Sequence, residues 1–280
     1  MNLPTSETTP DRFNTLPPSQ KRRIRLAIKN ASEGELDEFL HDELQPRSAT
    51  SLDYFLFLLL SAFVLFLAIV LDSPLLLLVA ALAAPFNGPI LGTMLSALIP
   101  SWSHFIRSLV CLIVTAAVYF AAGWLAGMVP LAKNATGDIP FTHLLQSTWL
   151  EWVILILAAG LFAWLFLRQN ETPRLTSALL SYLIFFPLAI SGWLLRTGMS
   201  GAWSALLLMA AARLAVTIFV GLLSFWLGGL PPRRVSGWLI FCLTVALTVS
   251  ALSGHFSSRN ILSNTLALHT APPPIGTSMQ

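Results

Sequence analysis

Seven runs of apolar residues, each near the length that crosses a lipid bilayer as a helix, constrain this 280-residue chain more than any other feature. Only 10% of its residues are charged, against roughly 25% in a typical soluble protein. The pattern predicts an all-α, multi-pass membrane protein and disfavours DNA-binding proteins, disulfide-rich secreted proteins and disordered chains. The predicted spans lie at about 52–71, 75–98, 105–129, 149–167, 175–195, 203–229 and 236–253.

The polar ends of the chain divide into three further segments. We predict a disordered tail at 1–18, a cytoplasmic amphipathic helical segment at 19–50, and a flexible tail at 254–280 after a transmembrane domain at 51–253. The first half of the amphipathic segment is basic and is either a solvated helical face or a contact for anionic lipid. The basic residues of that contact are Lys21, Arg22, Arg23 and Arg25.

Lysine and arginine residues set the predicted orientation. With the N-terminus in the cytoplasm, twelve of the sixteen basic residues fall on the inner side and three on the outer side. Such a bias is the usual signal of cytoplasmic connections, so we predict a cytoplasmic N-terminus. The inner residues are Arg12, Lys21, Arg22, Arg23, Arg25, Lys29, Arg47, Arg107, Arg168, Arg174, Arg233 and Arg234; the outer residues are Lys133, Arg196 and Arg259.

A shift of 102 residues aligns the second and third runs with the fifth and sixth. Pro85 then falls on Pro187, and 112–130 matches 214–232 at eight of nineteen positions, where composition alone gives roughly two. The alignment predicts two repeats of three spans, at about 51–130 and 149–232. Because three is odd, the second repeat is inverted, an arrangement common in secondary transporters. The span at about 236–253 is an addition outside the repeats.

Proline residues predict interruptions in helices 2 and 5. In Ala84–Pro89, two prolines four residues apart each remove a backbone donor and clash with the preceding turn. The fifth run has one proline in Phe186–Gly192. Interrupted helices are tolerated in a membrane where protein or a water-filled cavity satisfies the backbone, and the alternative is a pair of kinks that only shape packing. The residues of these two segments that we select are Pro85, Asn87, Gly88, Pro89, Pro187 and Ser191.

Arg213 lies about 15 Å along the sixth run, too deep for its side chain to reach either interface easily. A central arginine costs a few kcal/mol, so it needs a compensating partner. The acidic residues lie in tails, in loops or at span ends, with Asp53, Asp72 and Glu151 nearest. We therefore expect no carboxylate at the midplane. The open alternatives are a ligand site for an anion and a structural arginine that caps backbone carbonyls.

Other motifs give weaker signals. Gly88 with Gly92, and Gly123 with Gly127, have the spacing that permits close helix packing. The five histidines lie outside the spans, and the chain has no metalloprotease, serine-hydrolase or phosphate-loop motif. We therefore predict a protein that is not an enzyme and has no metal site, no cofactor and no nucleic-acid partner.

The segment Ala84-Pro85-Phe86-Asn87-Gly88-Pro89-Ile90-Leu91-Gly92, with Leu71–Pro74 before it and Arg107–Leu109 after it, resembles a family of bacterial and archaeal hydrophobic membrane proteins known as domain of unknown function 389. The resemblance implies a multi-pass inner-membrane protein of unassigned activity. Two departures are that the family usually has a second proline where this chain has Phe186, and commonly has asparagine where it has Arg213.

Two functions remain open from the sequence. The first is a transporter or channel-like protein for a small solute, an anion among the candidates, with its site between helices 2 and 5. Its pathway residues are Pro85, Asn87, Gly88, Pro89, Pro187, Ser191 and Arg213. The second is a structural or interaction protein of the lipid bilayer, with a homo-oligomer as one form, in which the helix breaks serve packing alone.

Overall fold

The structure is a computed structural model that describes residues 52–85, 87–98, 102–129, 149–169, 174–198 and 202–227. It also describes separate positions between 238 and 253, all of them helical. The predicted segments at 1–18, 19–50 and 254–280, and with them the lipid contact at Lys21–Arg25, lie outside the described residues. The extra span at 236–253 is described too sparsely to test, so the total of seven spans stays a prediction.

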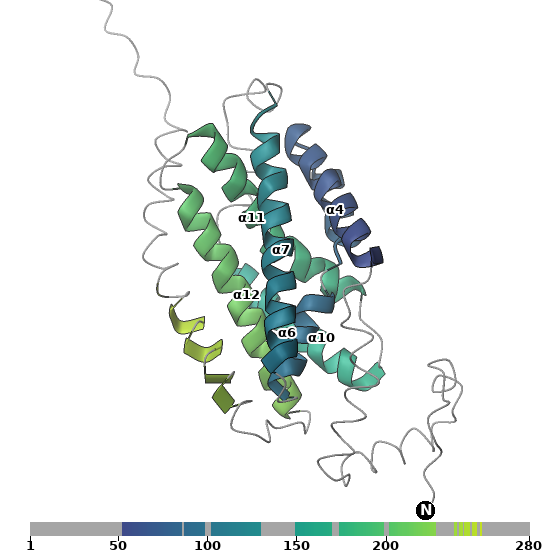
Figure 1. Ribbon diagram of the computed structural model, residues 1–280, viewed down its shortest axis with the longest axis vertical. Coiled ribbons are helices and arrows are strands. Elements are labelled where there is room, and N and C mark those ends of the chain that lie inside the picture. The colour runs from purple at the N-terminus through teal and green to yellow at the C-terminus, as the bar shows by residue number, and fades with distance from the viewer. Residues whose placement is uncertain are drawn as a thin grey trace, which may run out of the picture. The chain divides into compact units, whose positions relative to one another are not determined.

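Every regular element in the described ranges is an α-helix (Figure 1). Five helices are long and apolar enough to cross a membrane, and the pair α5 and α6 makes a sixth span if counted together. The chain is therefore an integral, multi-pass membrane protein. The helices are α4 (Leu52–Val70), α5 (Pro74–Ala83), α6 (Asn87–Leu98), α7 (Trp102–Ala126), α10 (Trp149–Gln169), α11 (Arg174–Thr197) and α12 (Ala202–Leu227).

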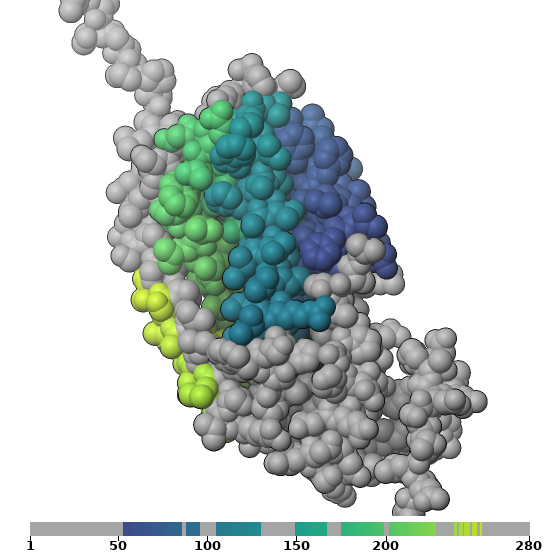
Figure 2. All heavy atoms as spheres, in the orientation of Figure 1, coloured from purple at the N-terminus to yellow at the C-terminus, as the bar shows by residue number. Residues whose placement is uncertain are grey.

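Helix α11 is the central helix of the bundle. Its apolar span is 83% buried, whereas the spans of α4 and α10 are only 33% buried. It packs against α7, α12, α10 and α5. The outer helices instead expose large apolar side chains such as Leu56 and Leu59 of α4 and Leu157 of α10, which match a hydrocarbon environment. Figure 2 shows the outer surfaces of α4, α7 and α12 on one face of the molecule.

Two pairs of helices run parallel with the same stagger. The third residue of α4, Tyr54, meets Thr115 near the middle of α7, and the third residue of α10, Glu151, meets Arg213 near the middle of α12. Figure 1 shows α4 beginning beside the middle of α7. Helix α4 therefore begins level with the middle of α7, and α10 begins level with the middle of α12. A residue at the start of α4 or α10 thus lies as deep in the bundle as one in the middle of its partner helix.

Helices α7 and α11 touch through their backbones. A Cβ atom added to Gly123 would overlap the carbonyl oxygen of Ala189, and one added to Gly192 would overlap that of Phe120. At Gly127 an added Cβ would lie 2.9 Å from Arg196 Cβ. Small residues thus allow the close approach of these two helices.

The other predicted glycine pair behaves differently. The nearest atoms to an added Cβ at Gly88 belong to the Tyr54 ring at 4.0 Å, an ordinary contact, so Gly88 is not a point of close approach. Gly92 is buried in α6. Instead, Gly221 of α12 meets the flexible side chain of Met94 on α6.

Helix 2 is interrupted where its two prolines predict. Helix α5 ends at Ala83, Ala84 is extended at φ −64° and ψ 124°, and α6 begins at Asn87, at an angle of 47° to α5. Pro85 has no N–H to donate to the carbonyl of Ala81, four residues earlier. A helix that continued through Pro85 would therefore lose this backbone hydrogen bond.

The predicted interruption of helix 5 is wrong. Helix α11 is continuous from Arg174 to Thr197 with Pro187 inside it. One proline removes a single backbone donor, the one that would serve the carbonyl of Leu183. The guanidinium of Arg213 supplies that donor instead, as the next subsection describes, so the helix is not forced to break.

Candidate functional site

Arg213 is buried, with 3% of its surface exposed, and joins three helices. Its Nη2 forms an ion pair with Glu151 Oε2 of α10, and its Nη1 donates to the Leu183 carbonyl of α11 at 2.9 Å. The Trp152 ring centroid lies 6.0 Å from the guanidinium carbon, within cation–π range. Arg213 is thus satisfied by the protein itself.

The expectation that no carboxylate reaches Arg213 is therefore wrong. Glu151 lies at a span end in the sequence, but α10 runs parallel to α12 and begins level with its middle. Gly160 faces Val220 and Ser224, and Phe166 contacts Phe225, which fixes the same register further along both helices. The signal that sequence reasoning missed is that Glu151 is an acidic residue inside an apolar run.

Uncharged polar side chains lie between α4 and α7, at the place that corresponds to the ion pair between α10 and α12. Thr115 Oγ1 donates to the Cys111 carbonyl at 2.8 Å, so the Tyr54 hydroxyl must be the donor in its bond to Thr115. In the other group Thr217 Oγ1 donates to the Arg213 carbonyl, also at 2.8 Å. The shift of 102 residues places Thr115 on Thr217, and both make the same backbone contact.

A second group of hydroxyls holds the end of α5. Ser61 of α4 donates from Oγ to the Ala80 carbonyl at 2.7 Å. Because its only hydrogen is used there, the Tyr119 hydroxyl of α7 must donate to Ser61 Oγ, at 2.8 Å. Ser61 and Tyr119 are both buried, so this chain ties α4, α5 and α7 together just before the helix break.

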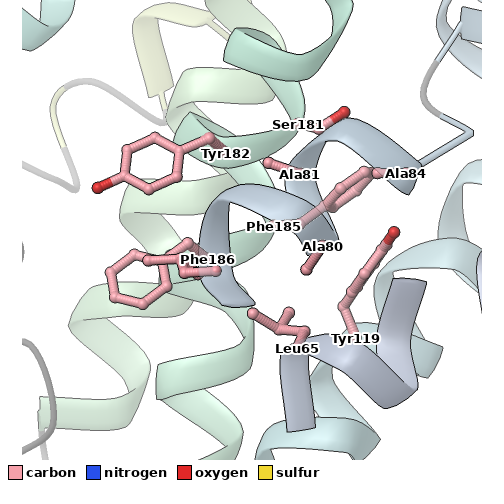
Figure 3. Close-up of a pocket in the computed structure, with 10 residues that line it drawn as sticks. Leu65, Ala80, Ala81, Ala84, Tyr119, Ser181, Tyr182, Phe185 and Phe186 are labelled. Atoms are coloured by element: carbon pink, nitrogen blue, oxygen red, sulfur yellow. The ribbon is translucent and has the colours of Figure 1, made fainter. Parts of the chain in front are cut away.

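A small pocket, with room for about one water molecule, lies at that break, among α4, α5, α7 and α11 (Figure 3). Tyr119 of α7 and Phe185 of α11 are stacked there with ring centroids 4.3 Å apart. Figure 3 shows the Tyr182 hydroxyl pointing away from the other labelled side chains. None of the described residues that line the pocket is charged. Its lining is Leu65, Leu77, Ala80, Ala81, Ala84, Tyr119, Ser181, Tyr182, Phe185 and Phe186.

The residues selected from sequence fall in three places. Pro85, Asn87, Gly88 and Pro89 lie in the break or the first turn of α6, next to Ala84 of the pocket. Pro187 and Arg213 are brought together through the Leu183 carbonyl.

Ser191 is the remaining candidate, one helical turn beyond Pro187 on α11. It is fully buried, and its Oγ has no hydrogen-bond partner among the residues that the structure describes. Such a group is a cost in an apolar interior unless something pairs with it.

The aromatic side chains of the pocket could not be identified from the sequence, because they come from two helices, α7 and α11, that lie far apart in the chain. Tyr119, Phe185 and Phe186 each look like ordinary apolar core positions in their own runs. The role of Ser61 could not be predicted from the sequence either, since a single serine in a membrane span is common.

Replacing Ser61 with alanine is expected to destabilise the protein by about 1–3 kcal/mol, because the Ala80 carbonyl and the Tyr119 hydroxyl each lose a buried partner. Thermal unfolding of the purified chain in detergent measures the effect. Ser224→Ala is the matched control, since Ser224 bonds only within its own helix, to the Val220 carbonyl. Equal losses in the two variants would contradict the role given to Ser61.

Comparison with known proteins adds no assignment. No protein-family model, no curated protein and no solved structure matches this chain. Within the described ranges, no three histidine, cysteine or acidic side chains gather as they would around a metal ion.

Proposed function

We propose that this protein lets a small solute cross the membrane, as a carrier or a channel-like protein, along a path at the α5–α6 break. One observation carries the proposal: an interrupted helix stands inside a membrane-spanning bundle, and a small pocket lies beside Ala84, the residue that follows the end of α5. Irregular backbone at such depth is tolerated where it is buried in protein or lines a cavity. The proposal involves no catalytic chemistry.

The proposal includes a duplicated, inverted architecture of three and three spans. Three features support it. The helices form two groups whose members contact one another. The first group is α4, α5–α6 and α7, and the second is α10, α11 and α12. The stagger of the first helix against the third is the same in both groups. Thr115 and Thr217 make equivalent bonds. In such folds the solute site lies between the repeats.

The membrane we propose is the inner membrane of a bacterium or archaeon, with the N-terminus in the cytoplasm. The bias of lysine and arginine along the sequence supports this orientation. The family resemblance supports the choice of membrane.

An anionic solute at Arg213 is no longer part of the proposal. The motive for it was an arginine without a partner, and Glu151 and the Leu183 carbonyl now fill that role. The path instead follows the α5 end of the bundle, where Ala84 and Pro85 are partly exposed.

Cysteine accessibility tests the path without knowledge of the solute. In a chain with Cys111 and Cys242 replaced by serine, Ala84→Cys in liposomes is treated with the membrane-impermeant, charged reagent sulfonatoethyl methanethiosulfonate. We expect Ala84→Cys to be labelled from at least one side, because a solute path must admit water. Arg196→Cys, at the exposed end of α11, is the positive control, and Ala159→Cys, fully buried in α10, is the negative control.

A non-catalytic structural or interaction protein is the second candidate. It is favoured by the internally satisfied Arg213 and by the backbone contact of α7 with α11, both of which make the bundle rigid. If Ala84→Cys proves as unreactive as Ala159→Cys from both sides, the water path is contradicted and the structural function stands.

A further inference from the structure

The ion pair of Arg213 and Glu151 is unevenly buried. The side chain of Arg213 is 4% exposed, whereas that of Glu151 is 25% exposed. Arg213 also has two further contacts, the Leu183 carbonyl and the Trp152 ring. Among the described residues, Glu151 has Arg213 as its one hydrogen-bond or ion-pair partner. The carboxylate is therefore the member of the pair that a small ligand can reach.

Glu151 lies in the first turn of α10. The backbone N–H groups of a first helical turn have no partner within the helix, so side chains, water or a ligand must satisfy them. This turn is level with Arg213, near the middle of α12, where an unpaired N–H group in hydrocarbon is costly. Water that serves those N–H groups also reaches the Glu151 carboxylate.

Two neighbouring helices present titratable groups to Glu151, because α10 packs against both α11 and α12. In the part of the chain that the structure describes, these groups are Arg213 of α12 and Tyr182 of α11. Tyr182 also lines the small pocket at the helix break, and its ring is stacked on Phe186 at 5.8 Å. Tyr182 therefore connects the ion pair with the α5–α6 break, so a change of charge at Glu151 acts on a residue beside the proposed path.

We propose that Glu151 binds and releases a proton, and so couples proton movement to solute transport along the path at the α5–α6 break. The inference rests on the proposed function and names its coupling ion. In the binding step, hydronium transfers its proton to a carboxylate oxygen of Glu151, which becomes a neutral carboxylic acid, and water is released. Arg213 keeps its charge and its bond to the Leu183 carbonyl.

Proton binding changes the energy of the contact between α10 and α12. With Glu151 ionised the pair is neutral, and with Glu151 protonated it has a net positive charge, which is unfavourable in an apolar interior. The acid still has a carbonyl oxygen that accepts a hydrogen bond from Arg213, so the contact is weakened rather than lost. The two protonation states therefore favour different positions of α10 against α12, as a coupling ion requires.

Infrared difference spectroscopy detects this proton directly, because a protonated carboxyl group and a carboxylate absorb at separate frequencies. The purified full-length chain, with isotope-labelled glutamate, is titrated in detergent from about pH 8 to about pH 4, a range that includes the ordinary titration of glutamate. We expect the wild-type chain to gain a protonated-carboxyl component that is lost in Glu151→Gln. Gly160→Ala, which changes the same interface and keeps the carboxylate, is the matched control and should retain the component.

Identical spectra of the wild-type chain and Glu151→Gln over the whole range would overturn the proposal, since Glu151 would then stay ionised as a purely structural partner of Arg213. If Glu151→Gln does not fold, the double variant Glu151→Leu, Arg213→Met replaces it, because removing both charges of a buried pair is often close to neutral.

A second measurement tests the coupling of this proton to the path. In liposomes, the labelling rate of Ala84→Cys is divided by that of Arg196→Cys at each pH, which removes the pH dependence of thiol reactivity itself. We expect this ratio to change with pH, and we expect the change to be lost when Glu151→Gln is added. A ratio that is independent of pH in both chains would overturn the coupling.

The failures of the two proposals are distinguishable. If Ala84→Cys is unreactive at every pH while the infrared component of Glu151 is present, the path is rejected and the proton site is retained. If Ala84→Cys is labelled while Glu151 shows no protonated component, the coupling is rejected and the path is retained.

Discussion

Replacing Glu151 with alanine is expected to destabilise the folded protein by about 3–5 kcal/mol, among the largest effects of any single change in this chain. The loss arises because Arg213, with 3% of its surface exposed, would keep its charge in an apolar environment without its carboxylate partner, while the Leu183 carbonyl and the Trp152 ring remain. Unfolding of the purified chain, followed in detergent by circular dichroism against temperature, measures the change.

The double variant Glu151→Leu, Arg213→Met serves as the control for the charge itself. Replacing both members of a buried ion pair with apolar residues is often close to neutral, so this variant is expected to recover most of the stability lost in Glu151→Ala. Part of the loss should remain, because the carbonyl of Leu183 then has neither the N–H of residue 187 nor the guanidinium. A double variant as unstable as the single one would show that the ion pair is not the source of the effect.

Replacing Gly123 with alanine is expected to cost about 3 kcal/mol or more, the upper range for overpacking, despite the higher helix propensity of alanine. The added methyl group meets the carbonyl oxygen of Ala189, which is backbone and cannot rotate away, so α7 and α11 must move apart. The midpoint of thermal unfolding and the yield of monodisperse protein both report this loss.

Gly160→Ala is the matched control for that prediction. Its added Cβ would lie 3.7 Å from Ser224 Oγ, an ordinary contact, so the change is expected to be neutral or slightly stabilising. If both glycine variants behave alike, the close α7–α11 contact is not what limits stability.

The sequence predicted local features better than distances between helices. The apolar runs, the break at Pro85 and Pro89, and the depth of Arg213 all follow from residues a few positions apart. The continuity of α11 could not be predicted in this way, because the donor that replaces the N–H of Pro187 comes from Arg213, 26 residues later in the chain.

The candidate site shows the same limit. In the sequence Glu151 lies at the end of a span. It is level with Arg213 because α10 is staggered against α12, and this stagger is set by helix packing. The pocket depends on Leu65, Ala84, Tyr119 and Phe185 meeting from four helices. Each of these residues has an unremarkable local pattern, so no periodicity within one run could have identified the pocket.

The bond from Arg213 to the Leu183 carbonyl also bears on how the chain is made. Because α12 follows α11 in the chain, the Leu183 carbonyl has no donor from Pro187 and none from Arg213 until α12 packs against α11. During that interval α11 is an incomplete span. The backbone hydrogen bonds of α11 are therefore completed by a side chain of α12, so the two helices form one structural unit.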